Sequence, residues 1–250
     1  WETKANEMEQ KEIDRIYKKV RDAIDQFGLI EEGDKILVGL SGGKDSLAML
    51  DFLSRKRQAP YPKFDMVAVH VSMSNIPYQS DIEYLRAYAN ALQVEFVHDI
   101  TSFDPTTDTR NTPCFLCSWT RRKRMFALAK ELGCNKMALG HHMDDMIQTL
   151  LMNMTFQGSF STMPPLLKMN KFDMCIIRPL SLVEEKDLIQ YALHKGYKKQ
   201  PHNCPYETDS NRTSIREVLD KMIQLNPHAK SSLLRSMMNV QDNYLPKSVK

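Results

Sequence analysis

Six consecutive residues near the start of the chain carry what an anion site needs: Ser41-Gly42-Gly43-Lys44-Asp45-Ser46. The two glycines allow a tight turn and a close approach of the backbone to a phosphate. The serine hydroxyls are donors, and Lys44 adds a positive charge. Asp45 is the exception, because a carboxylate beside a phosphate is repulsive unless a metal ion lies between them. The segment therefore predicts a nucleotide site with a divalent cation.

Two cysteines with a C-x-x-C spacing, Cys114 and Cys117, form a second group of reactive side chains. This spacing brings two thiolates close enough to share a metal or to form a redox pair, and the pattern alone leaves both open. We expect a helix to begin at Ser118, with Arg121 and Arg122 in its first turns. A nearby helix N-terminus and nearby cations both favour the thiolate. The cations could form a solvated face or contact a phosphate backbone.

A pair of carboxylates, Asp144 and Asp145, follows an apolar segment that ends at Gly140 and His141. Carboxylates before a helix, here expected from Met146, can simply accept hydrogen bonds from its free N–H groups. At a second strand-to-helix crevice of the same sheet they could instead hold Mg²⁺ on a pyrophosphate.

Apolar runs that alternate with amphipathic segments are the elements that would position these groups. Ligands of an open parallel sheet lie at the carboxyl ends of its strands, which is where His70 is expected. We expect an α/β fold, an open parallel sheet with helices on both faces. The expected strands are 36–40, 66–71, 94–97, 136–140 and 175–180.

The remaining segments were assigned from turn and cap signals. Residues 99–113 and 156–172 are expected to be irregular, and a capping box at Ser181 and Glu184 predicts the start of a helix that Gly196 ends. The expected organisation has three parts: an N-terminal helix at 1–30, a nucleotide-binding domain with the inserted Cys-x-x-Cys segment at 31–200, and a C-terminal cysteine loop with helices at 201–250.

Composition limits the class of protein. The chain has 250 residues, of which 42% are hydrophobic and 26% are charged, as in an ordinary globular protein. No apolar run approaches ~18 residues and the first residues are polar, so we expect no membrane segment, no signal peptide and a cytoplasmic location. Five cysteines suit reduced thiols or metal ligands better than a disulfide scaffold. Cys134 and Cys175 are expected to pack as small hydrophobic residues.

The segment SGGKDS resembles the PP-loop of the ATP pyrophosphatases, and GHHMDD resembles their second nucleotide motif. Members of that family cleave ATP between the α and β phosphates and adenylate a carbonyl oxygen. The resemblance implies Mg²⁺ on Asp45 with Asp144 or Asp145. It also implies that the nucleotide is bound by Ser41, Gly42, Gly43, Lys44, Asp45, Ser46, His70, Gly140 and His141.

Over nearly its whole length the chain resembles the tRNA 2-thiocytidine synthetase (TtcA) family. The matching pieces are SGGKDS, C-x-L-C-S with the arginine pair, ELGCNKMALGHHMDDMIQTL, NMTFQGSFSTMPP, IRPL with EKD, and the late cysteine loop. The resemblance implies a [4Fe–4S] cluster on Cys114, Cys117 and Cys204, with one iron open to sulfur. The family usually has a second C-x-x-C in the late loop, where this chain has Pro201.

The activity implied is tRNA thiolation. The C2 oxygen of a cytidine in the anticodon loop is adenylated and then replaced by sulfur, with Arg121 positioning the base or its phosphates. The implied partners are tRNA, a cysteine desulfurase or other sulfur donor, and a second copy in a homodimer, with no membrane. The alternatives are a persulfide-type thiolase, a lysidine-synthetase-like ligase, and an RNA-binding protein with a structural zinc.

Overall fold

The computed structural model describes residues 2–76, 80–104, 106, 113–170, 173–200 and 211–246, with side chains from residue 10 onward. The chain divides into two compact units, one formed by Trp1–His142 and Pro164–Thr208 and the other by Met143–Met163 and Asp209–Lys250. The predicted three-part organisation, with boundaries at residues 30 and 200, stays a prediction.

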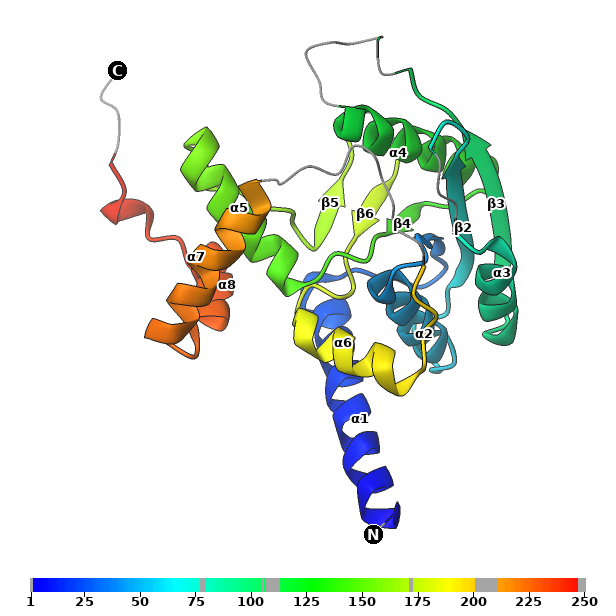
Figure 1. Cartoon of the computed structure of the whole chain (residues 1–250), viewed down its shortest axis with the longest axis horizontal. Coiled ribbons are helices and arrows are strands. Elements are labelled where there is room, and N and C mark those ends of the chain that lie inside the picture. The colour runs from blue at the N-terminus through cyan, green and yellow to red at the C-terminus, as the bar shows by residue number, and fades with distance from the viewer. Residues whose placement is uncertain are drawn as a thin grey trace. The chain divides into compact units, whose positions relative to one another are not determined.

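The first unit is built on a six-stranded sheet with the order β3-β2-β1-β4-β6-β5 (Figure 1). The strands are β1 (Lys35–Gly39), β2 (Asp65–Met73), β3 (Glu95–Thr101), β4 (Lys136–Ala138), β5 (Leu166–Lys168) and β6 (Cys175–Ile177). All neighbouring pairs are parallel except β5 and β6. The predicted α/β fold with a parallel sheet is therefore confirmed, with one antiparallel edge strand.

Strand β5 lies in a segment that we expected to be irregular. It has three residues, all exposed, and pairs Leu166 with Ile177 of β6. An exposed three-residue edge strand shows no alternation of apolar and polar residues, so the sequence pattern gives no sign of it.

Helices cover both faces of the sheet. On one face α1 (Glu2–Phe27), α2 (Lys44–Arg57), α3 (Ile82–Ala91) and α6 (Glu185–His194) pack against alternate residues such as Ile36, Val38 and Ala68. On the other face α4 (Pro113–Glu131) packs against Leu37 and Val67. Because successive residues of a strand point to opposite faces, a strand buried on both sides needs a continuous apolar run.

Several element boundaries differ from the sequence prediction near the candidate site. Strands β4 and β6 end at Ala138 and Ile177 rather than at residues 140 and 180. Strand β2 continues to Met73, because Ser72 and Met73 pair with Ile100 and Thr101 of β3. His70 therefore lies within a strand rather than at its end, and residues 99–101 are strand rather than loop. Helix α4 begins at Pro113, so the C-x-x-C lies inside the first turns of a helix instead of before one.

The predicted capping box of α6 is wrong. The N-cap is Glu184, whose side chain makes no capping hydrogen bond, and the Ser181 hydroxyl is buried with no hydrogen-bond partner among the described residues. The Val183 N–H donates to the Leu180 carbonyl in a tight turn, and the Ser181 N–H donates to the Arg178 carbonyl. Helix α6 ends at His194 with Lys195 as C-cap, and the predicted stop, Gly196, follows directly with φ +61°.

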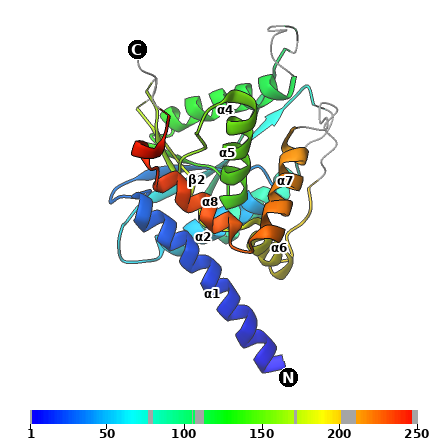
Figure 2. The ribbon, with the colours of Figure 1, turned by 90° about the vertical axis from the view of Figure 1, so that its left-hand side faces the viewer.

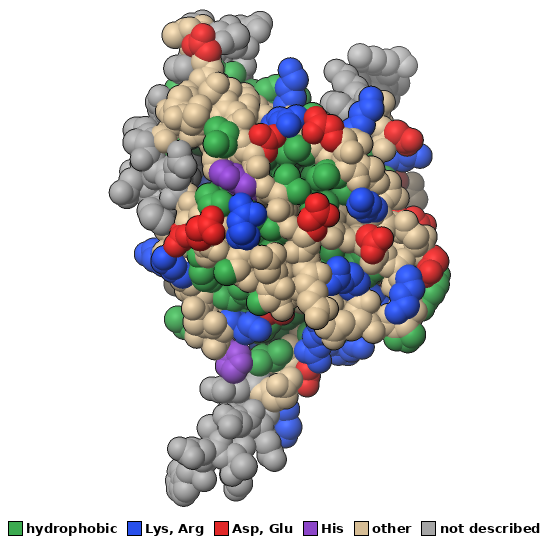
Figure 3. Space-filling view, turned by 90° about the vertical axis from the view of Figure 1, so that its right-hand side faces the viewer, with side chains coloured by type: hydrophobic (Ala, Val, Ile, Leu, Met, Phe, Trp, Pro, Cys, Tyr) green, Lys and Arg blue, Asp and Glu red, His purple; other side chains and the backbone are tan. Residues whose placement is uncertain are grey.

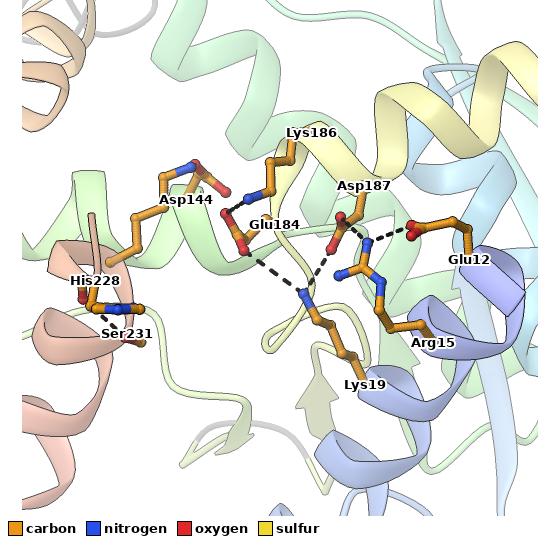
Figure 4. Close-up of polar contacts among 10 residues, drawn as sticks. Glu12, Arg15, Lys19, Asp144, Glu184, Lys186, Asp187, His228 and Ser231 are labelled. Carbon is orange, nitrogen blue, oxygen red and sulfur yellow. Dashed lines mark hydrogen bonds and ion pairs between the residues drawn. The ribbon is translucent and has the colours of Figure 1, made fainter. Parts of the chain in front are cut away.

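Helix α1 is fixed to α6 through one buried carboxylate. The N-terminal part of α1 extends away from the other elements of its unit (Figure 2). Further along, Arg15 Nη2 lies 3.0 Å and Lys19 Nζ 2.7 Å from the carboxylate of Asp187, whose side chain is 1% exposed (Figure 4).

The second unit contains α5 (Met143–Gln157), α7 (Asn211–Leu225), α8 (Ala229–Met238) and the short helix η1 (Asp242–Tyr244). Helix α5 begins at Met143, so Asp144 and Asp145 lie in its first turn rather than before it. Within this unit Lys230 Nζ lies 2.5 Å from Asp144 and Arg212 Nη1 lies 3.4 Å from Asp145. Among the described residues, no helix of either unit is long and apolar enough to span a membrane.

Candidate functional site

The loop that follows β1 is held in shape by its own residues. Gly42 has φ +91°, a conformation that side chains with a Cβ rarely adopt. The Gly42 N–H donates to Ser46 Oγ at 3.2 Å, and that hydroxyl donates to the Gly43 carbonyl at 2.9 Å. Ser41 Oγ lies 3.1 Å from Ser46 Oγ. Ser46 is buried and fixes the turn, while Ser41, Gly42 and Gly43 face a cavity.

The loop leads directly into the N-terminus of α2. The helix begins at Lys44 with Gly43 as its N-cap, and no side chain caps it. The first N–H groups of a helix have no partner within the helix, and the helix dipole favours an anion there. A Cβ added at Gly43 would meet only Ser41 Oγ, at 3.6 Å, so the approach to these N–H groups is open. This is a phosphate-binding geometry.

A cavity of about 870 Å³ opens beside this loop, entirely within the first unit. Its walls come from the loop, from the end of β2, from α4, from α6 and from the segment after α6. The polar and charged residues of its lining include Lys44, Asp45, His70, Arg121, Glu185 and Gln200. Such a volume suits a small-molecule ligand the size of a nucleotide.

Lys44 is held between two carboxylates. Its Nζ lies 3.1 Å from Asp45 and 3.3 Å from Glu185 at the start of α6. All three side chains are a quarter to a third exposed and line the cavity, so a phosphate could compete with these carboxylates for the ammonium group. Glu185 lies in the EKD segment, and no local sequence pattern indicates that it contacts the loop.

Arg121 is a cation in the cavity wall without an anionic partner in the described part of the chain. Its Nε is buried and has no hydrogen-bond partner among the described residues. Arg124, one turn further along the same helix, is paired with Asp99 and Glu131. A buried guanidinium nitrogen without an acceptor is energetically unfavourable. An anion in the cavity could accept a hydrogen bond from Arg121 and remove this cost.

His70 lies in the same wall and is neutral. Burial lowers its pKa to about 4, and the nearby Arg121 acts in the same direction. Its Nδ1 lies 2.7 Å from the Leu40 carbonyl, so a neutral ring donates a hydrogen bond to the end of β1. This bond ties β2 to the residue that enters the loop.

The connection after β4 lies against the loop but outside the cavity wall. A Cβ at Gly140 would come within 3.2 Å of the Ser46 backbone nitrogen, so the close contact requires glycine. His141 Nδ1 lies 3.2 Å from the Nε of Arg178, a buried residue that the sequence analysis did not single out. Burial lowers the pKa of Arg178 to about 10, with Arg122 adding to the effect.

The two cysteines of the C-x-x-C occupy the first turns of α4. Cys114 is exposed and Cys117 is half-buried, and positions three apart share one side of a helix. Cys117 packs with Leu116 against a small apolar cluster that contains Met73 and Phe103. Within the described ranges no three metal-binding side chains converge. Cys204 lies outside the described residues.

The other two cysteines differ in burial. Cys134 is buried, which raises the pKa of its thiol, so its predicted packing role is confirmed. Cys175 is only half-buried at the start of β6.

The segment after α6 closes one side of the cavity, and no motif in the sequence indicates it. Lys198 Nζ lies 2.5 Å from Asp81, the residue that caps α3, and Gln200 accepts a hydrogen bond from the Asp81 N–H at 2.8 Å. The aliphatic part of Gln200 lies 3.0 Å from the position of a Cβ on Gly42. The segment is therefore anchored on α3 and lies directly over the glycine loop.

These features define a class of protein. The glycine loop follows β1, and the Gly140 connection follows β4, its parallel neighbour. The chain reaches β2 and β3 on one side of β1 and β4 on the other, so the loop lies at the point where the strand order reverses. This arrangement is that of a PP-loop nucleotide-binding domain, and residues 6–223 match the family described as PP-loop domain.

Relatives narrow the class further. A tRNA-cytidine(32) 2-sulfurtransferase of Syntrophotalea carbinolica is 37% identical over 93% of both chains, and that of Geobacter sulfurreducens is 36% identical over 93% of this chain and 94% of its own. The U34-tRNA thiolase NcsA from Methanococcus maripaludis, solved with its [4Fe-4S] cluster, superposes with a TM-score of 0.76 at 25% identity, covering 96% of this chain and 83% of that chain. The chain belongs to the PP-loop domain family and, within it, to the tRNA-cytidine(32) 2-sulfurtransferases.

Proposed function

We propose that this enzyme is an ATP-dependent tRNA sulfurtransferase that converts a cytidine of the anticodon loop to 2-thiocytidine. The observation that carries the proposal is the cavity, whose wall joins a PP-loop to a helix that bears both Arg121 and the cysteine pair. The family membership supports the same reaction, since the compared relatives are named for it.

ATP is the substrate that the PP-loop would take. Its phosphates would accept hydrogen bonds from Ser41 and from the N–H groups at Gly43 and Lys44, with the Lys44 ammonium as counter-charge. Gly42 would let the loop backbone approach the phosphates, and Gly140 lets the connection after β4 pack against the loop at Ser46. Ser46 holds the shape of the loop. His70 and His141 would lie around the bound nucleotide. The glycine cradle and the uncapped helix N-terminus support this assignment.

Mg²⁺ on the pyrophosphate is part of the proposal. Asp45 borders the cavity, and carboxylate oxygens are the ligands that Mg²⁺ prefers. Asp144 or Asp145 would supply the second carboxylate. Both have a cation partner within their own unit, and an ion would have to share or displace Lys230 or Arg212.

Cys114, Cys117 and Cys204 are proposed as ligands of a [4Fe–4S] cluster. The donor set fits, because such clusters take cysteine thiolates and the described pair lies on one side of a helix, with an apolar cluster at Cys117. When bound, a cluster on three thiolates supplies an iron open to a sulfur ligand.

The reaction balances in two displacements. The C2 oxygen of the cytidine attacks the α-phosphorus of ATP and pyrophosphate leaves, which converts the oxygen into part of a leaving group. A sulfur nucleophile then attacks C2, and AMP departs with that oxygen. Arg121 would donate hydrogen bonds to phosphate oxygens as charge develops there, a role that its unpaired buried Nε supports. The neutral His70 would not compete with it for the anion.

The remaining partners complete the proposal. The sulfur would come from a cysteine desulfurase or another donor, and the enzyme would act on tRNA as a homodimer in the cytoplasm. The target base must be unpaired for C2 to be reached, which favours a loop nucleotide.

The alternatives make different demands. A persulfide-type thiolase would carry sulfur on Cys114 or Cys117 without iron, and a zinc-bearing RNA-binding protein would release no AMP. A lysidine-synthetase-like ligase would need no cysteine pair. The relatives compared are sulfurtransferases, which speaks against the ligase and the binding protein.

The test is metal content and AMP release in protein purified without oxygen. Iron and sulfide counts with EPR spectra should give a four-iron cluster in the wild type, lost in Cys204→Ala and retained in Cys134→Ala. AMP should form only when tRNA is added. Zinc, or iron that survives Cys204→Ala, would contradict the cluster, and AMP release without tRNA would contradict the adenylation.

A further inference from the structure

The first turns of α4 carry an aromatic face that the reaction described above does not use. Phe115 and Trp119 are 51% and 53% exposed, although large apolar side chains are usually buried. They are four positions apart and therefore lie side by side on one face of the helix. Leu116 and Cys117 of the same turns pack inward against the cluster that contains Met73 and Phe103. The helix thus turns Leu116 and Cys117 to the interior and the rings of Phe115 and Trp119 to solvent.

Two cations extend this face along the helix. Arg122 is three positions beyond Trp119 and Lys123 is four positions beyond it, and both are exposed. In the part of the chain described, neither side chain has an ion pair or hydrogen bond. The helix sequence from Pro113 to Arg124 contains no Asp or Glu. Exposed aromatic rings beside uncompensated cations are the surface that binds unpaired nucleotides, by base stacking and by contacts to phosphate.

The position of this face relates it to the chemistry. Cys114 is exposed in the same turn as Phe115, and Arg121, next to Arg122, reaches the cavity wall. Nucleotides held on the face would therefore lie on the same turns of α4 as the cysteine pair. Positions two apart on a helix point to nearly opposite sides, so an RNA loop held at Trp119 reaches Arg121 and the cavity by passing around α4. All these residues belong to the first unit.

We propose that Phe115 and Trp119 form a stacking platform for unpaired bases that flank the target nucleotide, with Arg122 and Lys123 contacting the RNA backbone. The proposal rests on the proposed tRNA substrate and deepens it. Phe115 and Trp119 are positioning residues: they hold the RNA loop open while a neighbouring base enters the cavity. Stacking tolerates any base, so the platform fixes a loop shape rather than a sequence.

The chain offers a built-in reporter for this surface. It contains two tryptophans, Trp1 and Trp119, so a Trp1→Phe variant leaves Trp119 as the single tryptophan. With full-length protein purified without oxygen, a short RNA hairpin with a single-stranded loop of anticodon-loop length should quench Trp119 fluorescence saturably. A blunt duplex with the same stem should not. Acrylamide should reach Trp119 in the free protein and be excluded by the hairpin.

Affinity for the labelled hairpin, measured by fluorescence anisotropy, distinguishes base stacking on the ring from simple contact with a large side chain. Trp119→Leu should weaken binding by roughly 5- to 100-fold, the range that loss of one base–aromatic stack gives, while Trp119→Phe keeps a ring and should bind within about twofold of wild type. Tyr61→Leu, which removes an exposed ring outside α4, is the matched control and should change nothing.

Three results would overturn the platform: wild-type affinity in Trp119→Leu, equal quenching by hairpin and duplex, or a Trp119 that acrylamide cannot reach in the free protein. The last would mean that the chain itself or a second copy covers the face. Failure of the platform is separable from failure of the proposed function. If Trp119→Leu thiolates tRNA with the wild-type kcat/KM, the platform is contradicted and the proposed function stands. If the hairpin binds as expected but no thiocytidine forms, the proposed function is contradicted and the platform stands.

Discussion

Ser46 and Gly42 show how individual residues of the PP-loop divide the work. The Ser46 hydroxyl accepts from one loop N–H and donates to one loop carbonyl, so the turn is closed before any ligand arrives. Gly42 supplies the positive φ that this closure requires. A loop held in shape by its own bonds loses little conformational entropy when it binds a phosphate, which favours affinity.

Gly42→Ala should therefore impair ATP binding more than folding. The alanine must adopt a left-handed backbone conformation, at a cost of about 1–2 kcal/mol. Its Cβ would lie 3.0 Å from the Gln200 side chain. Relief of that strain moves the loop N–H groups. We expect KM for ATP to rise about tenfold or more, measured by AMP release.

Gly133→Ala is the matched control for this variant. Gly133 also has positive φ, +68°, and a Cβ there would meet nothing within 4 Å. It should lose about 1–2 kcal/mol of stability with an unchanged KM for ATP. Equal effects of the two variants on KM would contradict a special role of Gly42.

His70 should make the folded state sensitive to mild acid. Burial holds its pKa near 4 in the folded protein, and the unfolded chain binds the proton near pH 6.5. The stability this neutral ring contributes is complete above about pH 6.5 and is lost as pH falls toward 4, by about 3 kcal/mol in all. Urea unfolding between pH 7.5 and 4.5 should show this decline in wild type.

His70→Asn should flatten that decline by removing the titrating group. His228→Gln, at an exposed position, should leave it unchanged. A wild-type pH dependence that persists in full in His70→Asn would assign the effect to other groups.

At the scale of elements, one buried carboxylate joins the first helix to the helix that borders the cavity. Asp187 at the start of α6 receives both Arg15 and Lys19 from α1. Several other cations of α1 and its neighbour are also engaged, as in Lys18 with Asp22 and Arg55 with Asp14. The basic residues of α1 thus serve largely to fix the helix rather than to present a free positive surface.

Asp187→Asn should loosen α1 from α6. Breaking a buried pair is strongly destabilising when the remaining charge stays buried. Here Arg15 and Lys19 are 45% and 25% exposed and can turn to water, so we expect a smaller loss, about 2 kcal/mol. The urea midpoint measures it. Asp22→Asn, in an exposed pair of the same helix, should change stability by less than about 0.5 kcal/mol.

How far sequence alone predicts this fold depends on whether an element has an apolar signature. Strand β1 and helix α2 follow directly from their hydrophobic patterns. Strand β5 does not, because it is short and exposed. Helix α4 begins five residues before the predicted Ser118, because the segment before Ser118 shows no helical periodicity. Ser181 and Glu184 have the spacing of a capping box, but the turn at Leu180 buries the serine.

The site divides in the same way. The PP-loop, the cysteine pair and Arg121 are recognisable because their residue types sit at fixed spacings along the chain. Glu185 and Gln200 reach the loop only through the packing of α6 and the segment after it. No local pattern encodes such contacts, since they depend on tertiary structure.

For the whole molecule, charge is mostly balanced rather than concentrated. The net charge is +3, and the face seen in Figure 3 mixes Lys and Arg with Asp and Glu. RNA affinity is then expected from a few uncompensated cations, of which Arg122 and Lys123 are consecutive and exposed. Neutralising two phosphates of a single strand predicts a slope of about −1.4 for log affinity against log salt concentration.

Arg122→Gln should reduce that slope by about 0.7. Arg124→Gln is the matched control on the same helix, since Arg124 is already paired with Asp99 and Glu131. Removing it should lower stability without changing the salt dependence. A slope unaffected by Arg122→Gln, or changed equally by both variants, would place the RNA contact elsewhere.

The most direct test of the account is the nucleoside composition of tRNA after reaction. Unmodified tRNA would be incubated without oxygen with the cluster-loaded protein, ATP, Mg²⁺ and a sulfide donor, then digested for mass spectrometry. We expect 2-thiocytidine with wild type and with Cys134→Ala, and none without ATP or with Cys117→Ser. Loaded wild-type protein that forms no 2-thiocytidine, or that forms it without ATP, would contradict the proposed ATP-dependent thiolation.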